Sequence, residues 1–147
     1  MQIKDVMTHA PEIVDANASV TEAATKMREL DVGSLPVCDG ERLQGLLTDR
    51  DIAIRLVAAG LDGSMTKVSE IMTPDAAYCF DDQTLDEAAV LMEAHQIRRL
   101  PILNRDKELI GILPLADLAV RTAGTEDREL ADEVLNEISE PTLTRRL

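Results

Sequence analysis

Apolar residues follow a helical spacing at two places along the chain, and each place is followed by two short apolar runs. In the helical stretches the apolar residues stand three, four and seven positions apart, as one buried face of a helix requires. They are Val20, Ala23, Ala24 and Met27 in the first stretch and Leu85, Ala88, Ala89 and Met92 in the second. Each stretch predicts an amphipathic helix whose small alanines let it lie close to a sheet.

The ends of these helices also have recognisable signals. A hydroxyl residue precedes each helix and a glutamate follows it three positions later, which is the pattern of a capping box. The pairs are Ser19 with Glu22 and Thr84 with Glu87. Gly33 is expected to end the first helix, because glycine readily adopts the left-handed conformation found at helix ends.

Two short strands joined by a polar turn are predicted after each helix. They cover residues 35–38 and 43–47, and then 100–103 and 109–113. Pro36 and Pro101 fall in the first strand of each pair, and because proline cannot donate to a β-ladder they predict an edge strand or a neighbouring bulge. A second helix should start at Thr48 in one case and at Pro114 in the other.

The chain contains one unit written twice, as shifts of 65 and then 66 residues reveal. The matches are Val6-Met7-Thr8 with Ile71-Met72-Thr73, Leu35-Pro36 with Leu100-Pro101, Gly45 with Gly111 and Asp51 with Asp117. We assign residues 3–57 to the first repeat, 58–69 to a linker and 70–121 to the second repeat. The tail, residues 122–147, is predicted to form an acidic amphipathic helix with a frayed end.

The composition is that of a soluble globular protein, with 45% hydrophobic and 29% charged residues. A formal charge of −13 argues against non-specific binding to nucleic acid or to a membrane surface. No apolar run approaches the roughly 18 residues of a membrane span, and we expect a cytoplasmic protein. Cys38 and Cys79 have no metal-site spacing and are predicted to be buried and unpaired.

Thr48 and Asp51 are the residues with the most informative chemistry. A helix that starts at Thr48 is expected to present unpaired backbone N–H groups, which suit a phosphate. The Asp51 carboxylate accepts hydrogen bonds, and the two hydroxyls of a ribose are natural donors to it. The same two residues also match a capping box that serves only the helix, and the two interpretations are compatible.

A unit of strand, helix, two strands and helix, with Leu-Pro in the middle strand and GxxTxxD at the last helix, resembles a CBS domain. The resemblance covers about residues 3 to 121 and rests on six motifs. These are VMT and IMT, SLPVCDG and RLPILNR, and GLLTDRD and GILPLAD. The short layout is similar to small bacterial CBS-pair proteins of the hypoxic-response type.

This resemblance implies an α/β fold of tandem β-α-β-β-α repeats, a Bateman module, packed with pseudo-twofold symmetry and followed by the C-terminal helix. Many such pairs bind AMP, ADP, ATP or S-adenosylmethionine in the clefts between the repeats. Transferred by position, the first site comprises Thr48, Asp51, Met72, Thr73, Ala76, Ala77 and Ile97, with Arg98 and Arg99 directed at ligand phosphates. A solvated pair at a helix end is the other interpretation of the two arginines. A second, weaker site comprises Thr8, Pro11, Val32 and Asp117, with Arg99 beside it. Pro114 stands where a Thr or Ser is expected, so the second site lacks the phosphate-facing hydroxyl.

The predicted function is therefore regulatory sensing of an adenosine nucleotide or derivative, without catalysis, obligatory cofactor or metal. The two histidines, His9 and His95, fall in different parts of the repeat and assemble no catalytic group. Partners implied by the resemblance are a second copy of the chain, in a homodimer, and an effector protein that the sequence does not identify. A ligand-independent dimerisation or protein-interaction module is the alternative.

Overall fold

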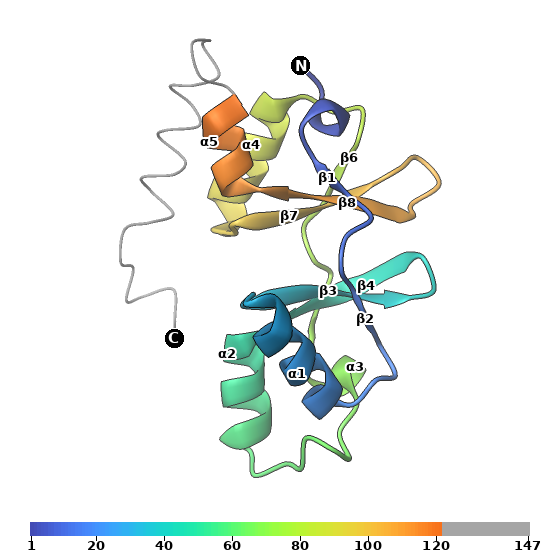
Figure 1. Cartoon of the computed structure of the whole chain (residues 1–147), viewed down its shortest axis with the longest axis vertical. Helices are drawn as coiled ribbons and strands as arrows, with labels where there is room; N and C mark the ends of the chain where they lie inside the picture. The colour runs from blue at the N-terminus through green and yellow to red at the C-terminus, as the bar shows by residue number, and fades with distance from the viewer. Residues whose placement is uncertain (122–147) are drawn as a thin grey trace. The chain divides into compact units, whose positions relative to one another are not determined.

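The computed structural model describes residues 1–121, which divide into two compact units (Figure 1). One unit comprises Glu12–Ala76 with Lys107–Leu109, and the other comprises Met1–Pro11, Ala77–Asp106 and the described residues from Ile110. The predicted C-terminal helix, in residues 122–147, lies outside the described residues. Each unit combines a four-stranded sheet with helices, so the predicted α/β class is confirmed.

The first unit contains the helices and strands of the first repeat from Val14 onward, together with two elements from further along the chain. They are β2 (Val14–Asp15), α1 (Val20–Leu30), β3 (Ser34–Asp39), β4 (Arg42–Thr48), α2 (Asp49–Asp51), the π-helical segment η2 (Ile52–Val57), α3 (Val68–Ile71) and β5 (Thr73–Pro74). The sheet order is β2-β3-β4-β5. Apolar side chains of α1, β3, β4 and α3 form its core, including Val20, Val37, Leu47 and Val68.

The second unit has the corresponding order of elements. They are η1 (Ile3–Asp5), β1 (Thr8–His9), β6 (Cys79–Phe80), α4 (Leu85–His95), β7 (Arg99–Leu103), β8 (Leu109–Pro114) and α5 (Leu115–Arg121). The sheet order is β1-β8-β7-β6. Leu85, Met92, Leu100 and Leu113 are among its fully buried residues.

The start of each repeat, which we call its lead-in segment, pairs with the sheet of the other repeat. The lead-in segments are residues 3–9 (η1 and β1) and residues 68–74 (α3 and β5). Strand β5 pairs antiparallel with β4, with Thr73 opposite Leu46, and β1 pairs antiparallel with β8. A glycine permits each close approach: a Cβ on Gly45 would lie 2.4 Å from the Thr73 carbonyl oxygen, and one on Gly111 would lie 2.9 Å from the Thr8 carbonyl oxygen. Each structural unit therefore combines the lead-in segment of one repeat with the remaining elements of the other.

The long helices begin as predicted but end differently. Ser19 Oγ accepts the Glu22 N–H and Thr84 Oγ1 accepts the Glu87 N–H, so the N-cap half of each predicted capping box is formed. The reciprocal bond from the glutamate side chain is absent from both described helix starts. The expectation that Gly33 ends the first helix is wrong. Asp31 takes the left-handed conformation there, with φ 54°, and Gln96 does the same for α4, with φ 55°; a non-glycine residue tolerates this conformation as a single helix-ending position.

The prolines lie in interior strands rather than at sheet edges. Strand β3 lies between β2 and β4, and β7 lies between β8 and β6. Proline is tolerated because β2 pairs only with Val37 and Cys38, which leaves Pro36 without a ladder partner on that side. The bulge that proline predicts is present in β3, where the register shifts between Val37 and Cys38. Through residue 121, none of the helices has the length and apolar character that crossing a bilayer requires.

Candidate functional site

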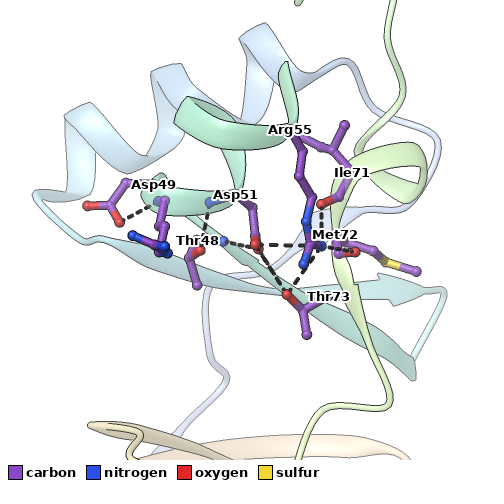
Figure 2. Close-up of polar contacts among 8 residues, drawn as sticks. Thr48, Asp49, Asp51, Arg55, Ile71, Met72 and Thr73 are labelled. Atoms are coloured by element: carbon purple, nitrogen blue, oxygen red, sulfur yellow. Dashed lines mark hydrogen bonds and ion pairs between the residues drawn. The ribbon is translucent and has the colours of Figure 1, made fainter. Parts of the chain in front are cut away.

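The end of β4 and the start of α2 are joined at Thr48 and Asp51 (Figure 2). Thr48 has an extended backbone, and its Oγ1 accepts the Asp51 N–H at 3.0 Å. The Asp51 carboxylate in turn accepts the Thr48 N–H at 3.0 Å. The two residues thus form a complete capping box, which confirms the structural interpretation that the sequence allowed.

The Asp51 carboxylate is buried and is bonded from a second side by the lead-in segment of the other repeat. The Thr73 hydroxyl lies 3.2 Å from Oδ1 and 3.3 Å from Oδ2. The Arg55 guanidinium forms an ion pair with Oδ1 at 3.6 Å. A residue that is only 7% exposed therefore keeps its charge compensated, as buried carboxylates require.

The Arg55 side chain also holds the same lead-in segment, by hydrogen bonds to the backbone of that segment. Its Nη1 donates to the carbonyl oxygens of Ile71 and Met72, both at 3.0 Å, and lies 3.5 Å from Thr73 Oγ1 (Figure 2). Ile71 is the last residue of α3, where unpaired carbonyl oxygens attract a cation. One guanidinium thus joins the helix after β4 to the strand β5.

The expectation of unpaired N–H groups at this helix start is wrong. The Asp49 N–H donates to the Gly33 carbonyl at 2.9 Å, and the Arg50 N–H donates to Oδ1 of Asp49 at 2.8 Å. With the Asp51 N–H bonded to Thr48, the chain itself occupies all three groups. The Gly33 carbonyl and the Thr48 hydroxyl accept two of these groups, and the Asp49 carboxylate folds back on the third.

The residues predicted for the first site fall in both units. Thr48, Asp51, Met72, Thr73 and Ala76 belong to one unit, and Ala77, Ile97, Arg98 and Arg99 belong to the other. Direct hydrogen bonds join three of them: Thr48, Asp51 and Thr73. Of the second set, Thr8, Pro11 and Asp117 share a unit, and Val32 lies in the other.

The corresponding junction of the second repeat has different chemistry. Pro114 ends β8 and has no hydroxyl for a cap, and Leu115 stands where the first repeat has Asp49. The Leu115 N–H donates to the Arg98 carbonyl oxygen at 2.7 Å, which corresponds to the bond from Asp49 to Gly33. The backbone junction is therefore repeated, while the second junction lacks the carboxylate that Asp49 adds to the first.

Comparison with known proteins agrees with this duplicated architecture. The CBS domain family matches residues 3–58 and 68–123. The chain belongs to the CBS domain family. It is 44% identical over 124 residues to the CBS domain-containing protein YhcV of Bacillus subtilis, covering 84% of this chain and 87% of that protein. It is 39% identical over 117 residues to Hypoxic response protein 1 of Mycobacterium tuberculosis, covering 79% and 81% of the two chains.

Solved CBS structures share the fold of this CBS pair. A crystal structure of Hypoxic Response Protein I with two coordinated zinc ions has a TM-score of 0.75 at 38% identity and covers 82% of this chain and 98% of that one. CBSX2 in complex with AMP has a TM-score of 0.70 at 30% identity, covering 83% and 95%. The CBS pair of MJ0100 with 5′-methylthioadenosine and S-adenosyl-L-methionine has a TM-score of 0.71 at 25% identity, covering 84% and 100%.

Sequence reasoning missed Asp49 and Arg55, although both have a local signal. Arg55 follows Asp51 by four positions, the spacing of an ion pair on one helix face. Asp49 is an acid at the first position after the cap, where it can bond the first-turn N–H groups. Their contacts to Arg50 and to the lead-in segment could not be read from the repeat alignment, which matches Asp49 with Leu115.

The described residues give no sign of metal or thiol chemistry. Within residues 1–121, no three His, Cys, Asp or Glu side chains gather to hold a metal ion. Cys38 and Cys79 are buried and unpaired, as predicted. Burial raises the pKa of both thiols to about 11, so neither is a thiolate near neutral pH.

Proposed function

We propose that this CBS pair is a regulatory module that binds an adenosine nucleoside or nucleotide at the Thr48–Asp51 junction. The Asp51 carboxylate carries the proposal, because the Thr73 hydroxyl bridges its two oxygens by bonds of 3.2 and 3.3 Å. Ribose offers two neighbouring hydroxyls that can replace this single hydroxyl. The AMP complex of CBSX2 and the 5′-methylthioadenosine and S-adenosyl-L-methionine complex of MJ0100 support an adenosine-type ligand.

The mechanism that follows is a population shift without catalysis. Thr73 lies on β5, which comes from the lead-in segment of the second repeat. A ligand that takes the Asp51 oxygens releases the Thr73 hydroxyl and changes how this segment is held. An effector protein that distinguishes the two arrangements then responds to the ligand through its differential affinity for them.

Calorimetric titration of the full chain with adenosine, 5′-methylthioadenosine, S-adenosylmethionine, AMP and ATP tests the proposal, with GTP as a control. We expect adenosine compounds alone to bind. Loss of charge-assisted hydrogen bonds in Asp51→Ala should weaken binding roughly tenfold to a hundredfold. Asp117→Ala, the matched change in the second repeat, should retain binding at the first junction.

The capping role of Asp51 requires a folding control. Asp51→Ala also removes half of a capping box, which costs about 0.5 to 2 kcal/mol, so circular dichroism must show that the variant is folded at the titration temperature. Unchanged affinity in folded Asp51→Ala, or no binding of any adenosine compound by the wild-type chain, contradicts the proposal.

A ligand-independent dimerisation module is the second candidate, favoured by an exposed apolar face. A groove between α1 and η2 is lined by Val20, Ala24, Ile52 and Leu56, among others. Ile54 and Val57 of η2, and Leu61 and Met65 after it in the chain, are each about half or more exposed, and exposed apolar residues that gather into one patch mark an interaction site. We infer that a second copy of the chain covers this surface, in a homodimer.

Sedimentation of Val57→Glu tests this homodimer, with Ser69→Glu as the control. We expect Val57→Glu to sediment as a monomer and Ser69→Glu as a dimer. A dimer that persists in Val57→Glu excludes this surface as the dimer interface.

A further inference from the structure

The charges around the Thr48–Asp51 junction bear on which ligands it accepts. A phosphate at a helix start is held by free N–H groups and by positive charge. Here the N–H groups of Asp49, Arg50 and Asp51 are already bonded to the Gly33 carbonyl, the Asp49 carboxylate and the Thr48 hydroxyl. A phosphate group therefore finds no free backbone N–H among Asp49, Arg50 and Asp51.

The side chains of the turn add negative charge. Asp49 is exposed, and its Oδ2 lies close to Gly33, where a Cβ would be 3.1 Å away. Asp51 supplies a second carboxylate. Of the two nearby arginines, Arg55 is engaged with Asp51 and with the Ile71 and Met72 carbonyl oxygens, and Arg50 is exposed. A phosphate at this helix start would meet the Asp49 carboxylate beside the exposed Arg50, in a chain whose formal charge is −13.

The second repeat shows that the fold does not require this acidic turn. Leu115 and Ala116 replace Asp49 and Arg50 there, and the backbone bond of Leu115 to the Arg98 carbonyl is still made. The carboxylate of Asp49 is therefore a property of the first junction alone. Since the fold forms without a carboxylate at one junction, the charge of Asp49 can act on what binds at the other.

We propose that the Thr48–Asp51 junction selects nucleosides with an uncharged or cationic 5′ group over nucleotides with a 5′ phosphate. This inference rests on the proposed function and specifies its ligand class. Asp51 accepts the ribose hydroxyls in either case, so the discrimination comes from Asp49 and from the absence of free N–H groups. Adenosine and 5′-methylthioadenosine meet no repulsion, and the sulfonium of S-adenosylmethionine is attracted to the Asp49 carboxylate.

The test compares AMP with 5′-methylthioadenosine by calorimetry in the Asp117→Ala chain, in which the second junction lacks its carboxylate. We expect AMP to bind at least about tenfold more weakly, a difference of about 1.4 kcal/mol. Asp49→Asn keeps a side-chain carbonyl for the Arg50 N–H but removes the charge. It should shift the ratio of the two affinities toward AMP by roughly tenfold.

Asp39→Asn is the matched control, since it removes an exposed carboxylate at the opposite end of β3, and it should leave the ratio unchanged. Binding of AMP as tight as that of 5′-methylthioadenosine, or a ratio that does not respond to Asp49→Asn, overturns this inference and leaves the proposed function standing. Binding of neither compound overturns the proposed function itself, together with this inference.

Discussion

The Thr73 hydroxyl bridges both carboxylate oxygens of Asp51, at 3.2 Å from Oδ1 and 3.3 Å from Oδ2. These residues come from different sequence repeats and meet because β5 pairs with β4. A hydroxyl proton shared between two oxygens at these distances makes a weak bond to each. The contact therefore adds one donor to a buried carboxylate that Thr48 and Arg55 also contact, and we expect a bound ribose to displace it.

Thr73→Val should destabilise the ligand-free chain, because it removes one donor from a buried carboxylate. We expect a loss of about 1.5 kcal/mol in the free energy of unfolding, the low end of the range for hydrogen bonds to charged groups. Urea denaturation at neutral pH measures it. Thr73→Ser retains the hydroxyl and should stay close to wild type; equal stability of the Val and Ser variants would show that the contact contributes nothing.

The two lead-in strands make a second prediction, at the glycines they cross. Gly45→Ala places a Cβ 2.4 Å from the Thr73 carbonyl oxygen, whereas Gly111→Ala places one 2.6 Å from the Met7 sulfur and 2.9 Å from the Thr8 carbonyl. Overpacking costs about 1 to 3 kcal/mol, and the backbone clash at Gly45 should cost more than the contact at Gly111, where the methionine can move. Thermal unfolding compares the stability of the two variants. A Gly45→Ala chain that is more stable than the Gly111→Ala chain would contradict the pairing of β5 with β4.

Arg55 should control the mobility of the lead-in segment. Arg55→Ala removes the donor to the Ile71 and Met72 carbonyl oxygens and should speed amide hydrogen exchange across Val68–Ile71 and Thr73. Arg50→Ala is the control, since Arg50 is an exposed arginine in the same turn and its loss changes the net charge equally. If the exchange rates in that segment are equal in the two variants, Arg55 does not have this role.

Much of the fold could be predicted because the helical spacing of Val20 and Leu85, the caps at Ser19 and Thr84 and the internal repeat all agree. The helix ends could not be predicted in the same way. Asp31 and Gln96 hold the left-handed conformation there, whereas a glycine was expected at the end of the first helix. Local preference pointed to Gly33 because glycine adopts this conformation most readily, whereas the first helix ends two residues earlier.

The candidate site was predictable in its residue types but not in its bonding. The pattern of Thr48 and Asp51 identified the capping box, yet the partner of each first-turn N–H depends on residues distant in sequence, such as Gly33. The contact of Asp51 with Thr73 likewise depends on β5 pairing with β4. The roles of Ala77, Ile97 and the arginine pair Arg98 and Arg99 in binding stay predictions.

The last prediction concerns acid stability in the unit that contains Asp82. Arg105 donates from Nε and Nη2 to the two Asp82 carboxylate oxygens at 2.8 and 2.7 Å, and its guanidinium carbon lies 4.2 Å from the centre of the Phe80 ring. The hydrogen bonds from Arg105 lower the pKa of Asp82 below its ordinary value of 3.8. Because the pKa is lower in the folded state, the pair stabilises the fold above pH 3.8, and this contribution disappears as pH falls through the lowered pKa.

Arg105→Gln should return the pKa of Asp82 toward 3.8, which carboxyl carbon NMR titration detects directly. The difference in unfolding free energy between Arg105→Gln and wild type should be present at neutral pH and vanish in strong acid. Lys107→Gln removes an exposed positive charge from the same turn and should leave the Asp82 titration nearly unchanged, because screened surface charges act weakly without direct contact. An equal shift in both variants would assign the effect to general charge rather than to the paired hydrogen bonds.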